Sequence, residues 1–152
     1  MISVYRLSSA LFPANNGMGA ALFGGRWNRV GTPVIYAAQS ASLAALEVLV
    51  HYSILPKDHE LTEIQIPDTL TILRLEENRL PDGWDAEAPI PATQNIGEIW
   101  VSESRSAILS VPSSIVPSDR NFILNPTHPD FADIAFQPSL RFHFDPRLKK
   151  QQ

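Results

Sequence analysis

Residues 24–51 have the sequence GGRWNRVGTPVIYAAQSASLAALEVLVH, in which a glycine pair and an arginine precede a short apolar strand and then a helix. Between Ser40 and His51, the ionisable side chains are Glu47 and His51 themselves. At about 100° per residue these two share one narrow stripe of the helix surface, while apolar side chains cover most of the rest. The pattern indicates a helix that is largely buried, or one that turns its carboxylate toward a cleft.

Glu47 therefore needs a compensating partner. A carboxylate in apolar surroundings loses several kcal/mol of hydration unless a cation or hydrogen bonds replace the water. Arg26 is the natural candidate within the same stretch. The residues alone leave three interpretations open: Glu47 points to solvent, it forms an architectural ion pair with Arg26, or it is a poised functional group.

Residues 28–33, NRVGTP, have the glycine and proline content of a hairpin loop. If that hairpin is symmetric about Gly31, Arg26 lies opposite Tyr36 on one face of a sheet, with about 5 Å between their Cβ atoms. A register slip of one residue would place them on opposite faces. We therefore predict that Arg26 and Tyr36 share a face and that Glu47 looks onto it.

The composition predicts a single globular domain over residues 1–152, because 44% of the residues are hydrophobic and 18% are charged. A net charge of −4 and no basic run beyond Lys149–Lys150 argue against direct binding of nucleic acid. Without cysteine there is no disulfide or thiolate, and the four scattered histidines lack metal-ligand spacing. The first residues given lack the basic and apolar pattern of a leader peptide, and no long apolar run occurs, so we expect a cytoplasmic protein without a membrane segment.

Thirteen prolines divide the chain into short pieces, which predicts many short strands and few long helices. The predicted strands are 2–7, 34–38, 61–66, 70–75, 106–111, 121–125 and 140–145, and the predicted helices are 40–53, 95–104 and 128–135. The turn at Pro67 predicts that 61–66 and 70–75 form a meander. Residues 81–95 are interpreted as a surface loop, either a plain connector or a lid. An α+β domain of six to eight short strands follows.

Three blocks of the sequence resemble one known family. They are residues 24–51, the stretch ILSVPSSIVPSDRNFILNPTHPDF (108–131) and the terminal FDPRL (144–148). In this order they are similar to the RES domain, whose members are the toxin halves of bacterial toxin–antitoxin pairs. The resemblance implies an ADP-ribosyltransferase-like fold, with a mixed or antiparallel arrangement of strands and a few short helices around an NAD-binding cleft. It also implies a toxin that arrests growth by cleaving the nicotinamide–ribose bond of NAD⁺, by phosphorolysis or hydrolysis.

The resemblance assigns catalytic roles to Arg26, Tyr36, Glu47 and Ser113, and places Arg26, Tyr36, Asn121 and Asn125 at the bound NAD⁺. It implies that Glu47 stabilises an oxocarbenium-like transition state, that Arg26 binds a phosphate, and that Tyr36 stacks on the nicotinamide ring. Ser113 would bond a ribose or phosphate oxygen, although the neighbouring Ser106 and Ser114 are alternatives. Asn121 and Asn125 either line the pocket or cap a turn.

On this interpretation NAD⁺ is a substrate, joined by inorganic phosphate if the reaction is a phosphorolysis, and no resident cofactor or metal is required. The expected partner is a cognate antitoxin of the Xre helix-turn-helix type that covers the pocket, in a dimer or a higher complex. Two alternatives are kept. One is a mono-ADP-ribosyltransferase that modifies a specific protein, and the other is a non-catalytic module that binds a nucleotide or a partner.

Several residues have ordinary structural interpretations. Tyr36 in an apolar strand is most often a core residue, and Ser113 beside a proline is most often a turn former. His51 is interpreted as a hydrogen-bonded histidine and His128 as a residue that fixes a loop. Trp27, Trp84 and Trp100 are assigned to packing, with contact to a ligand or partner as an alternative for Trp84 in the loop.

Overall fold

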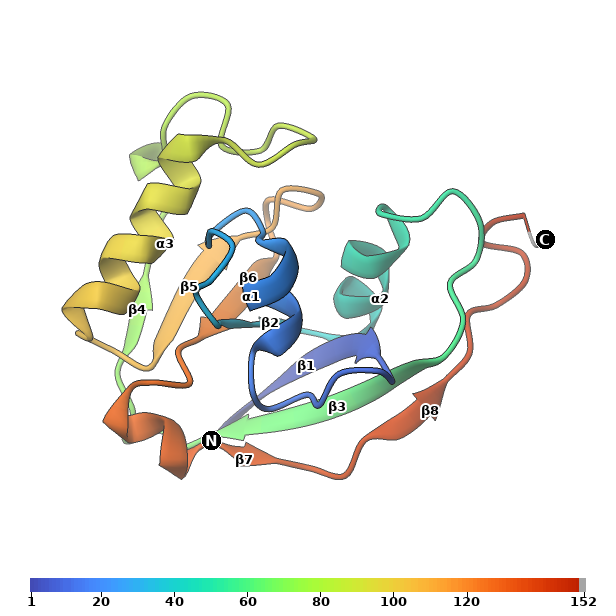
Figure 1. Ribbon diagram of the computed structural model, residues 1–152, viewed down its shortest axis with the longest axis horizontal. Coiled ribbons are helices and arrows are strands. Elements are labelled where there is room, and N and C mark those ends of the chain that lie inside the picture. Colours follow the sequence, from blue (N-terminus) through green and yellow to red (C-terminus); the bar gives the residue numbers. More distant parts are fainter. Residues whose placement is uncertain (151–152) are drawn as a thin grey trace.

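A computed structural model describes residues 1–150 of the chain, which form one curled sheet with helices packed against it (Figure 1). The elements in chain order are β1 (Ile2–Ser9), α1 (Met18–Phe23), β2 (Ile35–Ala38), α2 (Ala41–Leu49), β3 (His59–Ile66), β4 (Ile72–Arg74), the 3₁₀ helix η1 (Glu77–Arg79), α3 (Pro91–Glu103), β5 (Ile108–Pro112), β6 (Arg120–Leu124), the 3₁₀ helix η2 (Pro129–Asp133), β7 (Ala135–Phe136) and β8 (Leu140–Phe142).

The sheet has eight strands in the order β4-β5-β6-β2-β1-β3-β7, and β8 also pairs with β3. Strands β4 and β5 are parallel, and the other pairs are antiparallel. In Figure 1, β1 and β3 lie along the lower part of the molecule, while β5 stands to the left of α1 and β6 lies behind. The mixed sheet and its few short helices confirm the predicted α+β class.

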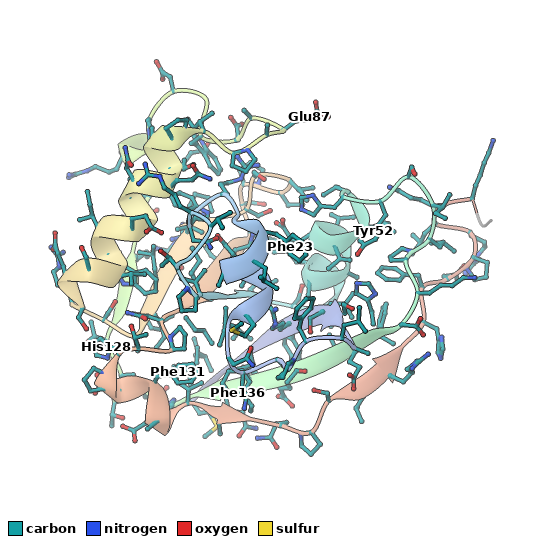
Figure 2. The ribbon with its side chains drawn as sticks, viewed as in Figure 1. Phe23, Tyr52, Glu87, His128, Phe131 and Phe136 are labelled. Atoms are coloured by element: carbon teal, nitrogen blue, oxygen red, sulfur yellow. The ribbon has the colours of Figure 1, made fainter. Side chains whose placement is uncertain are left out.

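The two faces of the sheet carry different cores, because successive side chains of a strand alternate between faces. Ile35 and Ala37 of β2 belong to a core that η2 and β7 complete through Phe131 and Phe136, both labelled in Figure 2. Tyr36 belongs instead to the opposite face, where α3 packs. That opposite core holds Trp27, Trp84 and Trp100, all buried, which confirms their assignment to packing.

All seven predicted strands are present, and the structure adds β7. The predicted meander is wrong. Strand β3 pairs with β1 along its whole length, from Ile2 opposite Ile66 to Ser9 opposite His59, and its other edge is taken by β7 and β8. With both edges occupied, β3 has no place for the next strand. Strand β4 instead crosses to the far edge of the sheet and pairs with β5.

The hairpin predicted around Gly31 is also wrong. Strand β2 begins only at Ile35, and its two edges are occupied by β1 and β6. Residues 24–33 therefore form a compact turn after α1, closed by an isolated bridge between Gly25 and Asn28. Helix α1 was not predicted, because it is only six residues long, begins after Gly17 in the left-handed region (φ 70°), and has no side-chain cap.

The helices are displaced from their predicted bounds at one end. Helix α2 ends at Leu49, so His51 lies outside it and is exposed. Helix α3 begins at Pro91, earlier than predicted, because proline is well suited to the first helical turn. The predicted helix at 128–135 is the short 3₁₀ helix η2. Within residues 1–150, none of the helices has the length and apolarity needed to cross a membrane.

Candidate functional site

Helix α2 holds Glu47 over the adjacent ends of β5 and β6. Ser40 caps the helix, because its Oγ accepts a hydrogen bond from the Leu43 N–H at 3.1 Å. Buried apolar side chains of α2 pack on the sheet, so the half-buried Glu47 points inward. Its Oε1 accepts two hydrogen bonds of 2.7 Å, one from the Ser113 hydroxyl and one from the Asn121 amide. No hydrogen bond reaches Oε2 from the described residues.

Ser113 donates its hydroxyl proton to Glu47 and has no exposed surface that a ligand could contact. Its Oγ accepts hydrogen bonds from the N–H groups of Ile115 and Val116, both at 3.1 Å, and its own N–H donates to the Asp119 carbonyl. With both lone pairs engaged, the hydroxyl has one proton to give, and Glu47 receives it. Ser113 is fully buried. The predicted bond from Ser113 to ribose or phosphate is therefore replaced by a bond to the carboxylate.

The structure also separates Ser113 from the neighbouring serines. Ser106 is buried at the other end of β5, where it accepts a hydrogen bond from the Trp100 indole at 3.0 Å and donates to the Ile108 carbonyl. Ser114 is half-buried, and Glu47 receives its hydroxyl bond from Ser113. Among the three candidates, Ser113 is the serine in contact with the carboxylate.

The two predicted asparagines have different surroundings. Asn121 lies opposite Ala38 on β2, and its side chain reaches Glu47, with its Oδ1 buried and unpartnered among the described residues. Asn125 lies past the end of β6 and is fully buried. Its Oδ1 accepts hydrogen bonds from the N–H and hydroxyl of Thr127, so it closes a turn. Asn121 thus forms with Ser113 and Glu47 one hydrogen-bonded group, the Glu47 cluster, whereas Asn125 closes a turn past the other end of β6.

Arg26 lies at the tip of the turn closed by Gly25 and Asn28, where the Gly25 N–H donates to the Asn28 carbonyl at 3.0 Å. Tyr36 reaches this turn from β2. A Cβ on Gly25 would lie 2.7 Å from the Tyr36 hydroxyl oxygen, so only glycine admits that approach. Arg26 and Tyr36 are therefore neighbours, as predicted, but through a turn packed against a strand rather than through paired strands.

The Arg26 guanidinium is held by backbone carbonyls. Nη1 donates to the Trp84 carbonyl and Nη2 to the Ala86 carbonyl, each at 2.7 Å. Burial lowers the pKa of Arg26, while the nearby negative charges of Glu47 and then Asp85 oppose that shift. No ion pair joins Arg26 to Glu47 in the described part of the chain. The architectural ion pair considered for Glu47 is thus not formed.

The Tyr36 hydroxyl is fully engaged inside the protein. It accepts a hydrogen bond from the Trp27 N–H at 3.0 Å and donates to the Asn28 Oδ1 at 2.6 Å. Burial raises the pKa of Tyr36 above its ordinary value, outweighing the bond from Trp27 and the charge of Arg26. The hydroxyl therefore stays protonated at neutral pH and is not a base. Stacking of its ring on nicotinamide stays a prediction.

Arg6 is a candidate site residue that the sequence did not identify. It lies on β1 next to Tyr5, the residue that pairs with Ala38 of β2. Its Nη1 donates to the Tyr36 carbonyl at 3.0 Å, and its buried Nε has no partner among the described residues. Burial lowers the pKa of Arg6 to about 10. An isolated arginine in the otherwise uncharged strand ISVYRLSS was the available signal.

The loop between η1 and α3 borders the Arg26 side of the site. It holds Trp84 in the core and extends to Glu87, which projects from its outer tip in Figure 2. An open hollow of about 610 Å³ is lined by residues of η1 and of the first half of this loop, between Glu77 and Asp85. A second, apolar hollow of about 390 Å³ lies on the side of α2 that faces the C-terminal segment, lined by Leu46, Leu49 and Phe144 among others. Neither hollow includes Glu47.

Two further predictions concern loops and metal ions. His128 accepts a hydrogen bond from the Asp130 N–H at 3.0 Å and contacts the Ser104 carbonyl, which confirms that it fixes a loop. Within residues 1–150, no cluster of three or more His, Cys, Asp or Glu side chains is arranged to hold a metal ion.

Comparison with known proteins identifies the family of this chain. The RES domain family model matches residues 3–145. "Toxin Res" of Photorhabdus laumondii is 43% identical over 97% of this chain and 97% of its own length. "Prs ADP-ribosylating toxin" of a Sphingobium species is 41% identical over 88% of this chain and 85% of its own length.

A solved structure shares the fold. The Mycobacterium tuberculosis MbcT–MbcA toxin–antitoxin complex contains a chain that superposes with a TM-score of 0.73, at 20% identity, over 93% of this chain and 84% of its own. With a family match over almost its whole length and two relatives above 40% identity, the chain belongs to the RES domain family.

Proposed function

We propose that this protein is the toxin of a toxin–antitoxin pair and that it cleaves the nicotinamide–ribose bond of NAD⁺. One observation carries the proposal. The negative charge of Glu47 lies near enough to Arg26 to raise the pKa of the guanidinium against the effect of burial, yet the carboxylate and the guanidinium are each held by uncharged groups. NAD⁺ presents the complementary pair of charges, a cationic nicotinamide ribosyl group and an anionic diphosphate.

Glu47 supplies the negative half of the site. When the bond between C1′ and the nicotinamide nitrogen breaks, the nitrogen takes the electron pair, nicotinamide leaves neutral, and positive charge develops on the ribose. A carboxylate fixed by Ser113 and Asn121 is preorganised to stabilise that charge. Its Oε2 has no partner among the described residues and is the oxygen available to a ribose hydroxyl or to the incoming nucleophile.

Arg26 supplies the positive half. Two of its five N–H groups are bound to carbonyls, so its remaining donors can meet a phosphate oxygen. Arg6 is a second cation near β2, and its unpartnered Nε is a further donor for an anion. Arg6 and Arg26 are both half-buried, and removing a guanidinium from water is costly unless an anion supplies the compensating charge.

The acceptor completes the reaction. Water added at C1′ gives ADP-ribose with release of a proton, and inorganic phosphate gives ADP-ribose 1″-phosphate. A second candidate function is transfer of ADP-ribose to a protein side chain, which the name of the Sphingobium relative favours. All these outcomes begin with release of nicotinamide, so the same Glu47 cluster would serve each.

The proposed partner is a cognate antitoxin that covers the site, because the fold neighbour was solved in a toxin–antitoxin complex. We propose an antitoxin of the Xre helix-turn-helix type, which would bring any DNA binding that the complex requires. We place the protein in the cytoplasm, where NAD⁺ is available to it.

Incubation of the purified protein with NAD⁺ tests the function. Nicotinamide release is measured in buffer alone, with inorganic phosphate, and with a cell extract in which labelled ADP-ribose on protein is detected. Phosphate-dependent release indicates phosphorolysis, release in buffer alone indicates hydrolysis, and protein labelling indicates transfer. Absence of nicotinamide release in all three arms, from protein purified free of antitoxin, would contradict the enzymatic proposal and favour a binding module.

A further inference from the structure

Asn28 is a fully buried polar side chain at the base of the turn that carries Arg26. Its Nδ2 donates to the carbonyls of Ala20 at 2.9 Å and Thr32 at 3.0 Å, and lies 3.2 Å from the Arg29 carbonyl. Its Oδ1 accepts from the Tyr36 hydroxyl. The amide therefore uses both donors and its acceptor inside the protein, as a buried polar group must.

The orientation of this amide is dictated by its neighbours. The Trp27 N–H points at the Tyr36 hydroxyl oxygen, so that hydroxyl has to donate its own proton elsewhere. The Tyr36 hydroxyl donates this proton to the Asn28 Oδ1. The other side of the amide faces three carbonyl oxygens, which need a donor, so the Nδ2 must lie there. A carboxylate would repel those carbonyls. An alkyl side chain would leave the proton of the Tyr36 hydroxyl and the Thr32 carbonyl without the hydrogen bonds that Asn28 provides.

The network links the Arg26 turn to the sheet that carries the Glu47 cluster. Tyr36 lies on β2, and two residues later Ala38 pairs with Asn121, which binds Glu47. On the opposite side, Gln94 of α3 donates to the carbonyls of Gly25 at 3.2 Å and Asn28 at 3.4 Å. The turn is therefore fixed between β2 and α3, and the position of Arg26 relative to Glu47 depends on it.

We propose that Asn28 is a positioning residue for anion binding. Through the Tyr36 hydroxyl it holds the turn so that the Arg26 guanidinium meets the substrate diphosphate. The inference rests on the proposed function, because it assigns the role of Arg26 to a phosphate. It adds that Tyr36 contributes through its hydroxyl, which does not touch substrate.

Tyr36→Phe and Asn28→Ala, singly and together, test the inference. Tyr36→Phe removes only the hydroxyl and keeps the ring, so it stays informative if Asn28→Ala does not fold. Ser106→Ala is the matched control, because it removes a buried hydroxyl that serves Trp100 in the same core. Two quantities are measured: the kinetics of nicotinamide release, and the affinity for ADP by calorimetry, since ADP carries the diphosphate but no nicotinamide bond.

Loss of one buried hydrogen bond in the network is expected to raise both the KM for NAD⁺ and the Kd for ADP about tenfold. We expect kcat to change less than KM, the double variant to resemble Asn28→Ala alone, and Ser106→Ala to keep wild-type values. Unchanged ADP affinity in Tyr36→Phe, or effects of the two substitutions that add, would overturn the inference. If the wild type binds ADP but releases no nicotinamide, the cleavage proposal fails while a tenfold loss of ADP affinity still supports Asn28. A wild type that releases nicotinamide but does not bind ADP would overturn the inference and leave the cleavage proposal standing.

Discussion

The Glu47 cluster and the Arg26 turn hold opposite charges by the same means. Glu47 receives two side-chain hydrogen bonds, from Ser113 and Asn121, and Arg26 gives two to the carbonyls of Trp84 and Ala86. Both sets of partners are uncharged. In an architectural ion pair each charge would neutralise the other. Here both charged groups are held in place, and neither is neutralised by a direct ion pair.

The two regions differ in what holds them in place. Of the two Glu47 partners, Ser113 follows the last residue of β5 and is fully buried, and Asn121 lies on β6, and both strands are interior strands of the sheet. The Arg26 partners come from a loop that leads into α3 and carries the exposed Asp85 and Glu87. We infer that the carboxylate is the rigid half of the site and that the guanidinium is the half whose position depends on a turn, a loop and a helix.

Glu47→Gln is the change with the largest expected effect. Glutamine keeps the size of the side chain and an oxygen that can accept from Ser113 and Asn121, but it removes the negative charge. We expect kcat for nicotinamide release to fall about a thousandfold, because charge stabilisation at the transition state is lost. Circular dichroism and the urea midpoint should stay near those of the wild type. A variant that folds and keeps near-normal turnover would remove Glu47 from the mechanism.

Gly97→Ala disturbs the Arg26 side without touching Glu47. A Cβ on Gly97 would overlap the Trp27 carbonyl oxygen, so α3 would have to move away from the turn. We expect the free energy of unfolding to fall by about 3 kcal/mol. This sign is opposite to the gain of up to about 1 kcal/mol that alanine gives in an unobstructed helix. A urea titration that shows equal or higher stability would contradict the close packing of α3 on the turn.

Ser113→Ala weakens the hold on the Glu47 carboxylate. It removes one of two donors to the carboxylate and leaves two backbone N–H groups without their acceptor. We expect kcat to fall about tenfold, with little change in KM, and the free energy of unfolding to fall by about 1–3 kcal/mol. Ser114→Ala is the control one residue away. Equal kinetics for the two variants would mean that Ser113 does not position the carboxylate.

The smallest expected effect is on stability at alkaline pH. The pKa of Tyr36 is raised in the folded protein, so the folded chain keeps a proton that the unfolded chain loses above about pH 10. Its contribution to stability is full below that pH and declines as the pH rises above it. Unfolding in urea at about pH 8 and about pH 11 should show a smaller alkaline loss for Tyr36→Phe than for the wild type. Identical losses would indicate that the hydroxyl is solvated.

Local patterns in the sequence predicted where the strands lie, but they did not predict how the strands pair. Alternation and proline spacing located seven of the eight strands, because both are properties of neighbouring residues. The pairing of β4 with β5 depends on which edges remain free after β3 has bound β1, β7 and β8. That competition is not local, and a turn signal at Pro67 could not reveal it.

The candidate site likewise has residues that the sequence identified and residues that only the fold reveals. The resemblance to RES domains named Glu47, Ser113 and Asn121, which the structure brings together from distant parts of the chain. Asn125 has a similar sequence setting to Asn121, but it lies past the end of β6 and serves a turn. Arg6 is an isolated arginine in an otherwise uncharged strand, but that pattern alone does not show whether its side chain leaves the solvent. Burial decides its role, and burial follows from the fold.

The central claim is that NAD⁺ bridges two separately held charges, and the kinetics of nicotinamide release for four proteins test it most directly. These are the wild type, Arg26→Lys, Glu47→Gln and the double variant. Lysine keeps the charge but loses the planar fork, so Arg26→Lys should raise KM about tenfold and alter kcat little, whereas Glu47→Gln should lower kcat and leave KM nearly unchanged. Losses of both variants in the same kinetic parameter, or an Arg26→Lys protein identical to the wild type, would contradict the account.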